Sequence, residues 1–204
     1  IELGSGRLVG VEALLRWEHP KLGLIPPLRF IPLAESRGLM GEIGLWVLTE
    51  SCRQWARWHE RGLDVGRMAI NVSATQFRGG RGLEQMTEII DSGIAPPAAL
   101  EIEFTESAFV DAGQDTLAWI AALRERGVHF AIDDFGTGYS SLIMLRQIQA
   151  DKLKVDREFV KDMLTDPNDA AIVHATVSLA KTLGMVVVAE GIEEAEQADY
   201  LRVI

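Results

Sequence analysis

Polar residues that could do chemistry recur where short apolar runs of this sequence end. They are Glu12, Asn71, Glu103, Asp133 with Asp134, Lys154 and Glu190. Carboxylates gathered at one place repel one another unless cations neutralise them. Oxygen ligands of this kind suit Mg²⁺, Mn²⁺ or Ca²⁺ rather than zinc. The pattern therefore predicts a site for hard divalent cations.

Asp133 and Asp134 form an adjacent pair of carboxylates. Consecutive residues of a strand point to opposite faces, but the end of a strand lets both turn toward the same side. One carboxylate could then bridge two metal ions, which would activate water and stabilise the charge developing on a phosphodiester. In the simpler alternative, Asp134 only caps the following turn.

Lys154 and Asp156 alternate with apolar residues and are expected on one face of a strand. A lysine there could hold a hydroxide or a phosphoryl oxygen, with Asp156 orienting it. The two residues could instead form a structural ion pair. Arg16, four residues beyond Glu12, could reach a substrate phosphate or be a solvated charge at a strand end.

The apolar runs that precede these residues are typical of parallel strands with helices between them. The runs span residues 7–15, 67–73, 99–105, 128–134, 152–156 and 185–190. Gly62, Gly127 and Gly184 follow helical patterns and are predicted to cap helices with a positive φ, whereas residues 79–82 are predicted as a loop. The alternation indicates an α/β fold, either a doubly wound sheet or a (β/α)8 barrel. Polar residues at the ends of several strands favour the barrel, whose sites form at the carboxyl ends of its strands.

Composition limits the classes of function. A net charge of −10 argues against the broad basic surface that binds DNA or RNA duplexes. The single cysteine excludes an intrachain disulfide, in keeping with a cytoplasmic location. Apolar runs are too short to span a bilayer, so a membrane anchor of the parent protein is expected outside this segment. Because the chain begins at Ile1 and stops within a helical pattern, we expect residues 1–204 to be a single domain from a longer chain.

Several segments, taken in order, closely resemble those of one protein family. They are EALLRW at 12–17, FIPLAE at 30–35, NVS at 71–73, EFTES at 103–107, DDFGTGYSSL at 133–142, LKVD at 153–156 and AEGIE at 189–193. Over essentially its whole length the chain resembles the EAL domains of cyclic di-GMP phosphodiesterases. This resemblance implies a modified TIM-type (β/α)8 barrel that hydrolyses cyclic di-GMP to linear 5′-pGpG with two Mg²⁺ or Mn²⁺ ions. Relatives begin with a Tyr-Gln-Pro strand and end with a Gln-Gly strand, so the barrel is expected to lack its first and last strands here.

The resemblance also implies roles for individual residues. Lys154 matches a lysine that contacts the nucleophilic water, Arg16 a phosphate contact, and Asp156 is assigned with it to substrate binding. Glu106 matches a glutamate that positions the loop after Asp134, and Glu193 another glutamate near the site. The implied metal ligands are Glu12, Asn71, Glu103, Asp133, Asp134 and Glu190, of which Glu12 and Glu190 join Lys154 as the catalytic set. A homodimer and, in the full-length protein, an attached sensor or GGDEF-type domain are further expectations.

Two other functions remain as alternatives. A catalytically silent domain would bind cyclic di-GMP and signal through a partner domain, but such relatives usually lose metal ligands. A glycoside hydrolase would also place paired carboxylates at the mouth of a barrel. That second alternative explains neither the adjacent Asp133 and Asp134 nor Lys154.

Overall fold

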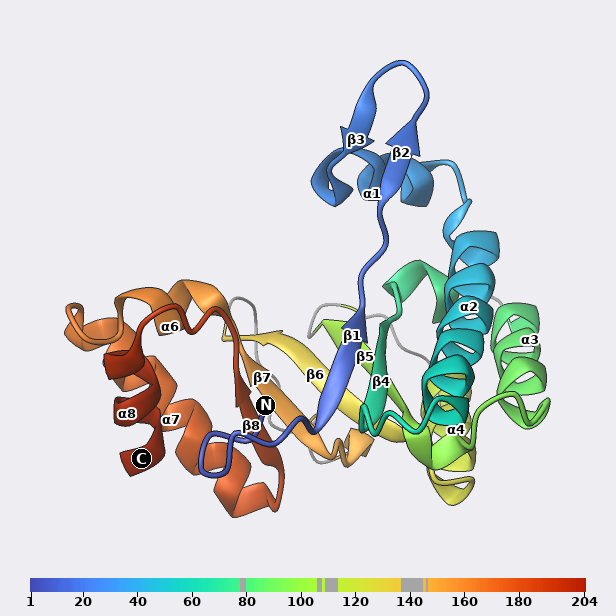
Figure 1. Ribbon diagram of the computed structural model, residues 1–204. Coiled ribbons are helices and arrows are strands. Elements are labelled where there is room, and N and C mark those ends of the chain that lie inside the picture. The colour runs from blue at the N-terminus through green and yellow to red at the C-terminus, as the bar shows by residue number, and fades with distance from the viewer. Residues whose placement is uncertain (78–79, 106–107, 109–113, 137–144, 146) are drawn as a thin grey trace.

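The apolar runs of the sequence form one parallel sheet, in the order β1-β4-β5-β6-β7-β8 (Figure 1). The structure is a computed structural model that describes residues 1–77, 80–105, 108, 114–136, 145 and 147–204. The strands are β1 (Gly10–Ala13), β4 (Arg67–Asn71), β5 (Leu100–Thr105), β6 (His129–Phe135), β7 (Lys152–Val155) and β8 (Val186–Ala189). All the predicted strands are therefore present, although β1 is shorter than the run at 7–15.

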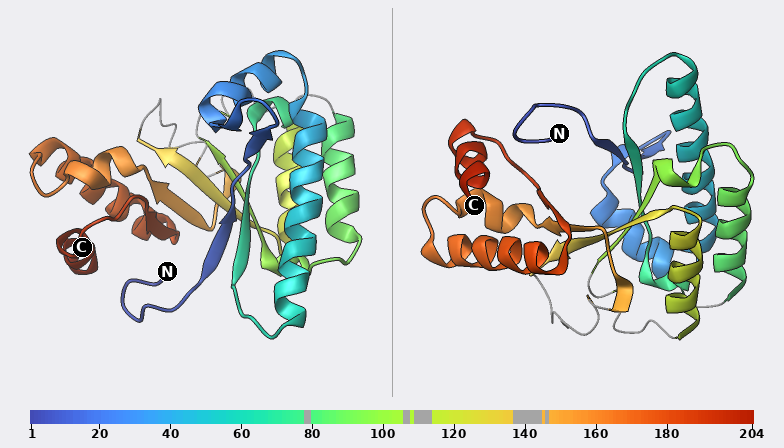
Figure 2. Two further views of the ribbon diagram at one scale, coloured as in Figure 1. Left: turned by 45° about the horizontal axis from the view of Figure 1, so that its top comes forward. Right: turned by 90° about the horizontal axis from the view of Figure 1, so that it is seen from below.

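The sheet curls into a half-barrel with β1 and β8 at its edges (Figure 2). Because every neighbouring pair is parallel, the carboxyl ends of all six strands meet at one mouth. This arrangement confirms the predicted modified (β/α)8 barrel without its first and last strands. It also decides against a flat, doubly wound sheet.

Helices cover the outer face of the sheet in two groups (Figures 1 and 2). The first group packs near β4, β5 and β6, and comprises α2 (Met40–Glu60), α3 (Gly80–Asp91) and α4 (Gln114–Glu125). The second lies beside β7 and β8, and comprises α6 (Arg157–Asp162), α7 (Pro167–Leu183) and α8 (Ala195–Val203). Helix α1 (Pro27–Ser36) and the hairpin β2 (Trp17–His19) and β3 (Gly23–Ile25) project beyond β1, and short 3₁₀ turns occur at Ala74–Phe77 and Pro97–Ala99.

Strand β5 separates apolar from polar side chains by strict alternation. Along β5, Leu100, Ile102 and Phe104 are buried in the main core, which packs against the first group of helices. Glu101 and Glu103 lie between them and point to the opposite face, the interior of the half-barrel. The outer face therefore supplies the hydrophobic core, and the inner face is left for charged groups.

The predicted glycine caps are confirmed. Gly62, Gly127 and Gly184 have φ values of 74°, 94° and 73°, which glycine adopts without the clash that a Cβ would cause. The predicted loop at 79–82 was wrong for residues 80–82, because α3 already begins at Gly80, and residue 79 lies outside the described residues. Among the described residues, no helix is both long and apolar enough to cross a membrane.

Candidate active site

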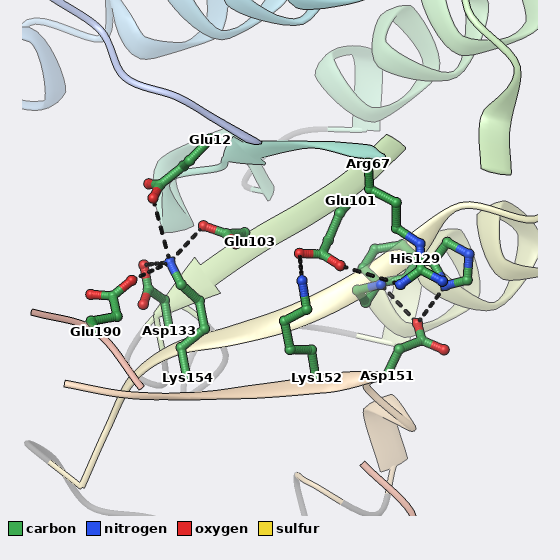
Figure 3. Close-up of polar contacts among 11 residues, drawn as sticks. Glu12, Arg67, Glu101, Glu103, His129, Asp133, Asp151, Lys152, Lys154 and Glu190 are labelled. Carbon is green, nitrogen blue, oxygen red and sulfur yellow. Dashed lines mark hydrogen bonds and ion pairs between the residues drawn. The ribbon is translucent and has the colours of Figure 1, made fainter. Parts of the chain in front are cut away.

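Lys154 lies at the centre of a ring of carboxylates inside the mouth of the half-barrel (Figure 3). Its Nζ is 2.7 Å from Glu190 Oε1 and 2.8 Å from Glu103 Oε2. Asp133 Oδ2 lies 3.1 Å from the same nitrogen, and Glu12 Oε2 3.8 Å. The residues come from β1, β5, β6, β7 and the segment after β8, so strands far apart in the sequence assemble one site. One ammonium faces four carboxylates, which leaves an excess of negative charge.

Asn71 extends this ring on the side of β1. Its side-chain Nδ2 donates a hydrogen bond of 2.7 Å to Glu12 Oε1. The amide therefore fixes the orientation of Glu12 while its own oxygen stays available as a ligand. The Glu12 side chain is 32% exposed, which leaves it accessible from the mouth.

An irregularity in β6 brings Asp133 and Asp134 to the same side. Ile132 pairs with Leu153 and Phe135 with Val155, so two residues of β6 stand opposite Lys154 alone. Asp134 has a φ of 53°, and its N–H donates a hydrogen bond of 3.0 Å to Asp133 Oδ1. A bulge of this kind redirects a side chain that regular alternation would send to the other face. It gives the physical reason for the adjacent pair predicted from the sequence.

The carboxylates of Asp133, Asp134 and Glu190 offer oxygen atoms that all lie within 4.8 Å of one another. That spacing suits a hard divalent cation, which takes several oxygen ligands. The donor set therefore fits Mg²⁺ or Mn²⁺ on this side of the ring. An acidic cluster with such a fit supports a cation site of the kind predicted, and the same donors would accept either ion.

The pKa values of the ring report this crowding. Burial raises the pKa of Glu103 to about 7, although the charge of Lys154 opposes the shift. Burial and the neighbouring Asp133 raise the pKa of Asp134 to about 6, and burial also raises the pKa of Glu190. Burial alone would lower the pKa of Lys154, but the Glu103 and Asp133 carboxylates raise it above its usual value. Lys154 is therefore charged throughout the physiological range. The surrounding carboxylates share the three N–H donors of its ammonium group.

The metal-free protein is expected to lose stability as the pH rises from about 5 to about 8. Because the pKa values of Glu103 (about 7) and Asp134 (about 6) exceed those of the unfolded chain, the folded state binds more protons in this window. Their contribution is present at low pH and is lost as each group ionises in the folded protein. Urea unfolding in EDTA at a series of pH values measures the effect, and Glu103→Gln should flatten the slope.

Saturating Mg²⁺ should reverse this trend, since ligation requires ionised carboxylates. A metal-free protein that instead gains stability from pH 5 to 8, with no difference between wild type and Glu103→Gln, would contradict the shifts assigned to the ring.

The remaining predicted residues have different surroundings. Asp156 is the N-cap of α6, where its Oδ1 accepts a hydrogen bond of 2.6 Å from the Glu158 N–H, and its side chain also contacts Asp134. The ion pairs of Lys154 are formed with the ring and not with Asp156, within the described part of the chain. Asp156 is thus positioned to orient Asp134 rather than Lys154.

Within the described part of the chain, Arg16 and Glu193 make none of the contacts that form the ring. Arg16 is exposed, donates a hydrogen bond to Leu15 O at 2.9 Å, and borders an apolar groove of about 440 Å³ with Trp17 and Trp46. Glu193 is exposed, and its N–H binds the Gln197 side chain. Glu106 lies outside the described residues.

Sequence reasoning missed two polar contacts near the site. Glu35 Oε1 accepts a hydrogen bond of 2.6 Å from Ser73 Oγ, which ties α1 to the segment that follows Asn71. Glu101 and Lys152 form an ion pair two residues before Glu103 and Lys154 on the same strands. The alternating patterns EIE at 101–103 and KLK at 152–154 were the available signal for this second pair.

Comparison with known proteins identifies the family. The family model described as "EAL domain" matches residues 1–204. The chain belongs to the EAL domain family. Among curated proteins, this EAL domain is 44% identical over 197 residues to the bifunctional diguanylate cyclase/cyclic di-GMP phosphodiesterase MucR of Pseudomonas aeruginosa. It is 38% identical over 200 residues to the oxygen sensor protein DosP of Escherichia coli.

The matches cover nearly the whole EAL domain but only part of these relatives. They include 97% of this chain and 29% of MucR, and 98% of this chain and 25% of DosP. The solved structure of the MucR phosphodiesterase in complex with c-di-GMP has a TM-score of 0.90 and 43% identity, covering 97% of this chain and 80% of that one. The chain thus spans between a quarter and a third of the curated relatives it matches.

Proposed function

We propose that this EAL domain is a metal-dependent phosphodiesterase that hydrolyses cyclic di-GMP to linear 5′-pGpG. The observation that carries the proposal is the ring of carboxylates around Lys154, contributed by separate strand ends. Such a ring needs cations to balance its charge, and an anionic phosphodiester is attracted only after that balance is reached. The kinship with MucR, which is named for this activity, supports the choice of substrate.

The proposed cation ligands are the polar residues of the mouth. Two Mg²⁺ or Mn²⁺ ions, when bound, would lower the pKa of water and neutralise charge on the phosphate. The residues proposed to hold them are Glu12, Asn71, Glu103, Asp133, Asp134 and Glu190. We keep Mg²⁺ and Mn²⁺ as equal candidates, since both prefer oxygen ligands.

Lys154 and Glu190 are proposed to orient the attacking water. The 2.7 Å contact between them places a proton donor beside a carboxylate acceptor at the mouth. Water would then attack phosphorus in line with the departing 3′ oxygen, whose bond to phosphorus breaks as the new one forms. The 3′ oxygen leaves with a proton, and the product carries a 5′ phosphate.

The other predicted residues serve binding and support in this proposal. Arg16 would pair with a phosphate of the substrate, and Asp156 would contribute to substrate binding through its contact with Asp134. Glu106 and Glu193 would position the loop that follows Phe135. These roles follow from the resemblance, and single substitutions would test each.

We further propose that residues 1–204 act as one EAL-type domain within a longer polypeptide. MucR and DosP, whose names describe a cyclase and a sensor function, are several times longer than the matched region. An attached sensor or GGDEF-type domain and a homodimer fit this proposal. Mass photometry of the full-length protein would test the dimer.

Hydrolysis of cyclic di-GMP by the full-length protein is the decisive experiment. With Mg²⁺ or Mn²⁺ we expect linear 5′-pGpG, and EDTA should lower the rate by at least about 10³-fold. Re-addition of Mn²⁺ after EDTA serves as the control for irreversible damage. Tight binding of cyclic di-GMP by a folded, metal-loaded protein without turnover would instead support the alternative of a catalytically silent receptor.

A further inference from the structure

Two Lys–Glu pairs lie at successive levels along β5 and β7 inside the half-barrel and appear side by side in Figure 3; the pair nearer the mouth is called the upper pair and the other the lower pair. The upper pair is Lys154 with Glu103, and the lower pair is Lys152 with Glu101. Each lower residue precedes its upper counterpart by two positions on β7 or β5, so both pairs share the inner face of the sheet. Within the described part of the chain, Glu101 forms ion pairs with Lys152 and Arg67, and none of the ion pairs of the lower pair involves a proposed cation ligand.

Both pairs bridge strands that are not neighbours. β6 lies between β5 and β7, and its residue Ala131 is the register partner of both Glu103 and Lys152. Ala131 is fully buried, and its methyl group is small enough for the longer side chains to meet across it. The lower ion pair is therefore a direct tie between β5 and β7 at the level just below the ring.

The lower pair is buried deeply enough for its loss to matter. Glu101 is 1% exposed, and its Oε2 has no hydrogen-bond partner among the described residues. The Arg67 guanidinium is 3.7 Å from that oxygen, whereas Lys152 bonds the other oxygen of the carboxylate directly. A buried carboxylate that loses its main cation forces the surroundings to repack. Loss of Lys152 would leave the buried Glu101 carboxylate with only the more distant Arg67 as a counter-charge.

We propose that Lys152 is a positioning residue that acts through Glu101 to hold Lys154 in the centre of the ring. Two residues of a strand span about 6.6 Å, so a shift of β7 against β5 at Lys152 passes directly to Lys154. Lys154 Nζ would then leave its close contacts with Glu103 and Glu190. Residues that support ligands in this way affect both metal affinity and turnover. The activity readout rests on the proposed function, whereas the metal-binding readout does not.

Lys152→Met in the full-length protein tests the proposal, because it keeps the length of the side chain and removes the charge. We expect kcat for cyclic di-GMP to fall about 10- to 100-fold while KM stays within about 2-fold. Mn²⁺ affinity, measured by electron paramagnetic resonance, should weaken about 10-fold. Lys152→Arg keeps the charge and should restore both quantities to within about 3-fold of wild type.

Arg126→Met is the matched control, because Arg126 forms a 3.0 Å ion pair with Asp91 at the surface, away from the ring. It should change neither kcat nor Mn²⁺ affinity. If Lys152→Met does not fold, the double variant Lys152→Met/Glu101→Met buries no unpaired charge and should fold while kcat and Mn²⁺ affinity stay low. Wild-type kcat and Mn²⁺ affinity in a folded Lys152→Met or double variant would overturn the proposal. Wild-type protein that binds Mn²⁺ but never hydrolyses cyclic di-GMP would refute the proposed function alone.

Discussion

Lys154→Met is expected to lower turnover strongly and to destabilise the metal-free protein. The substitution removes the one ammonium that contacts Glu12, Glu103, Asp133 and Glu190, and leaves Glu103 buried without its nearest cation. Breaking a buried ion pair from one side costs about 3 kcal/mol, which lowers the Tm of a domain of this size by roughly 10 °C. Loss of a preorganised donor should also lower kcat by about 10²- to 10³-fold. Circular dichroism and a cyclic di-GMP assay measure the two effects.

Divalent cations separate these two consequences of Lys154→Met. Without the ammonium, a bound cation meets less repulsion in the ring, so Mn²⁺ should raise the Tm of the variant more than that of wild type. Activity should stay low, because the cation does not replace the donor to the attacking water. Lys21→Met, in the exposed turn between β2 and β3, is the control and should leave both Tm and kcat unchanged. A variant at Lys154 with wild-type Tm in EDTA would show that the ring does not need its central charge.

Glu12→Ala is expected to remove nearly all turnover while the protein stays folded. Glu12 lies near the end of the edge strand β1, and its partly exposed side chain supports little of the core. Its loss frees the Asn71 amide and removes a proposed cation ligand, which we expect to lower kcat by about 10³-fold, or about 4 kcal/mol. Thermal unfolding, cyclic di-GMP hydrolysis and a Mn²⁺ titration of the same sample check the prediction.

Two further variants show whether the effect of Glu12→Ala comes from the loss of its negative charge at the mouth. Glu12→Gln keeps the shape and the hydrogen bond from Asn71 in reach, so an equal loss of activity would assign the effect to the negative charge. Glu60→Ala, at the exposed end of α2, removes a carboxylate that lies far from the mouth and should be neutral. Full activity of Glu12→Ala would rule out Glu12 as a cation ligand.

The half-barrel could be predicted from the sequence because its signals are local and repeated. Each strand has an apolar run followed by a polar residue, and glycines such as Gly184 mark the helix ends that precede strands. The gathering of Glu103, Asp133 and Lys154 followed from topology, since parallel strands bring their carboxyl ends together. These inferences needed no knowledge of side-chain distances.

Features that depend on how deeply a side chain is buried, or on the local conformation of the backbone, could not be predicted from the sequence. Glu101 and Lys152 have the same residue types as Glu103 and Lys154, but a polar residue early in a strand reads as solvent-exposed until the curvature of the sheet is known. The hairpin of β2 and β3 has strands of three residues, too short for an alternating pattern to be recognised. Helix α3 begins within a glycine-rich stretch that propensity alone assigns to a loop.

The bulge in β6 places two selective demands on a single residue. Asp134 holds a left-handed backbone conformation, with φ at 53°, that costs an ordinary residue about 1 kcal/mol and costs glycine almost nothing. Glycine at this position would relieve the backbone and at the same time delete a carboxylate from the mouth. At residue 134, glycine would therefore favour the stability of the fold, whereas aspartate keeps the carboxylate at the mouth. An EAL domain that did not need this carboxylate would be expected to accept glycine at residue 134.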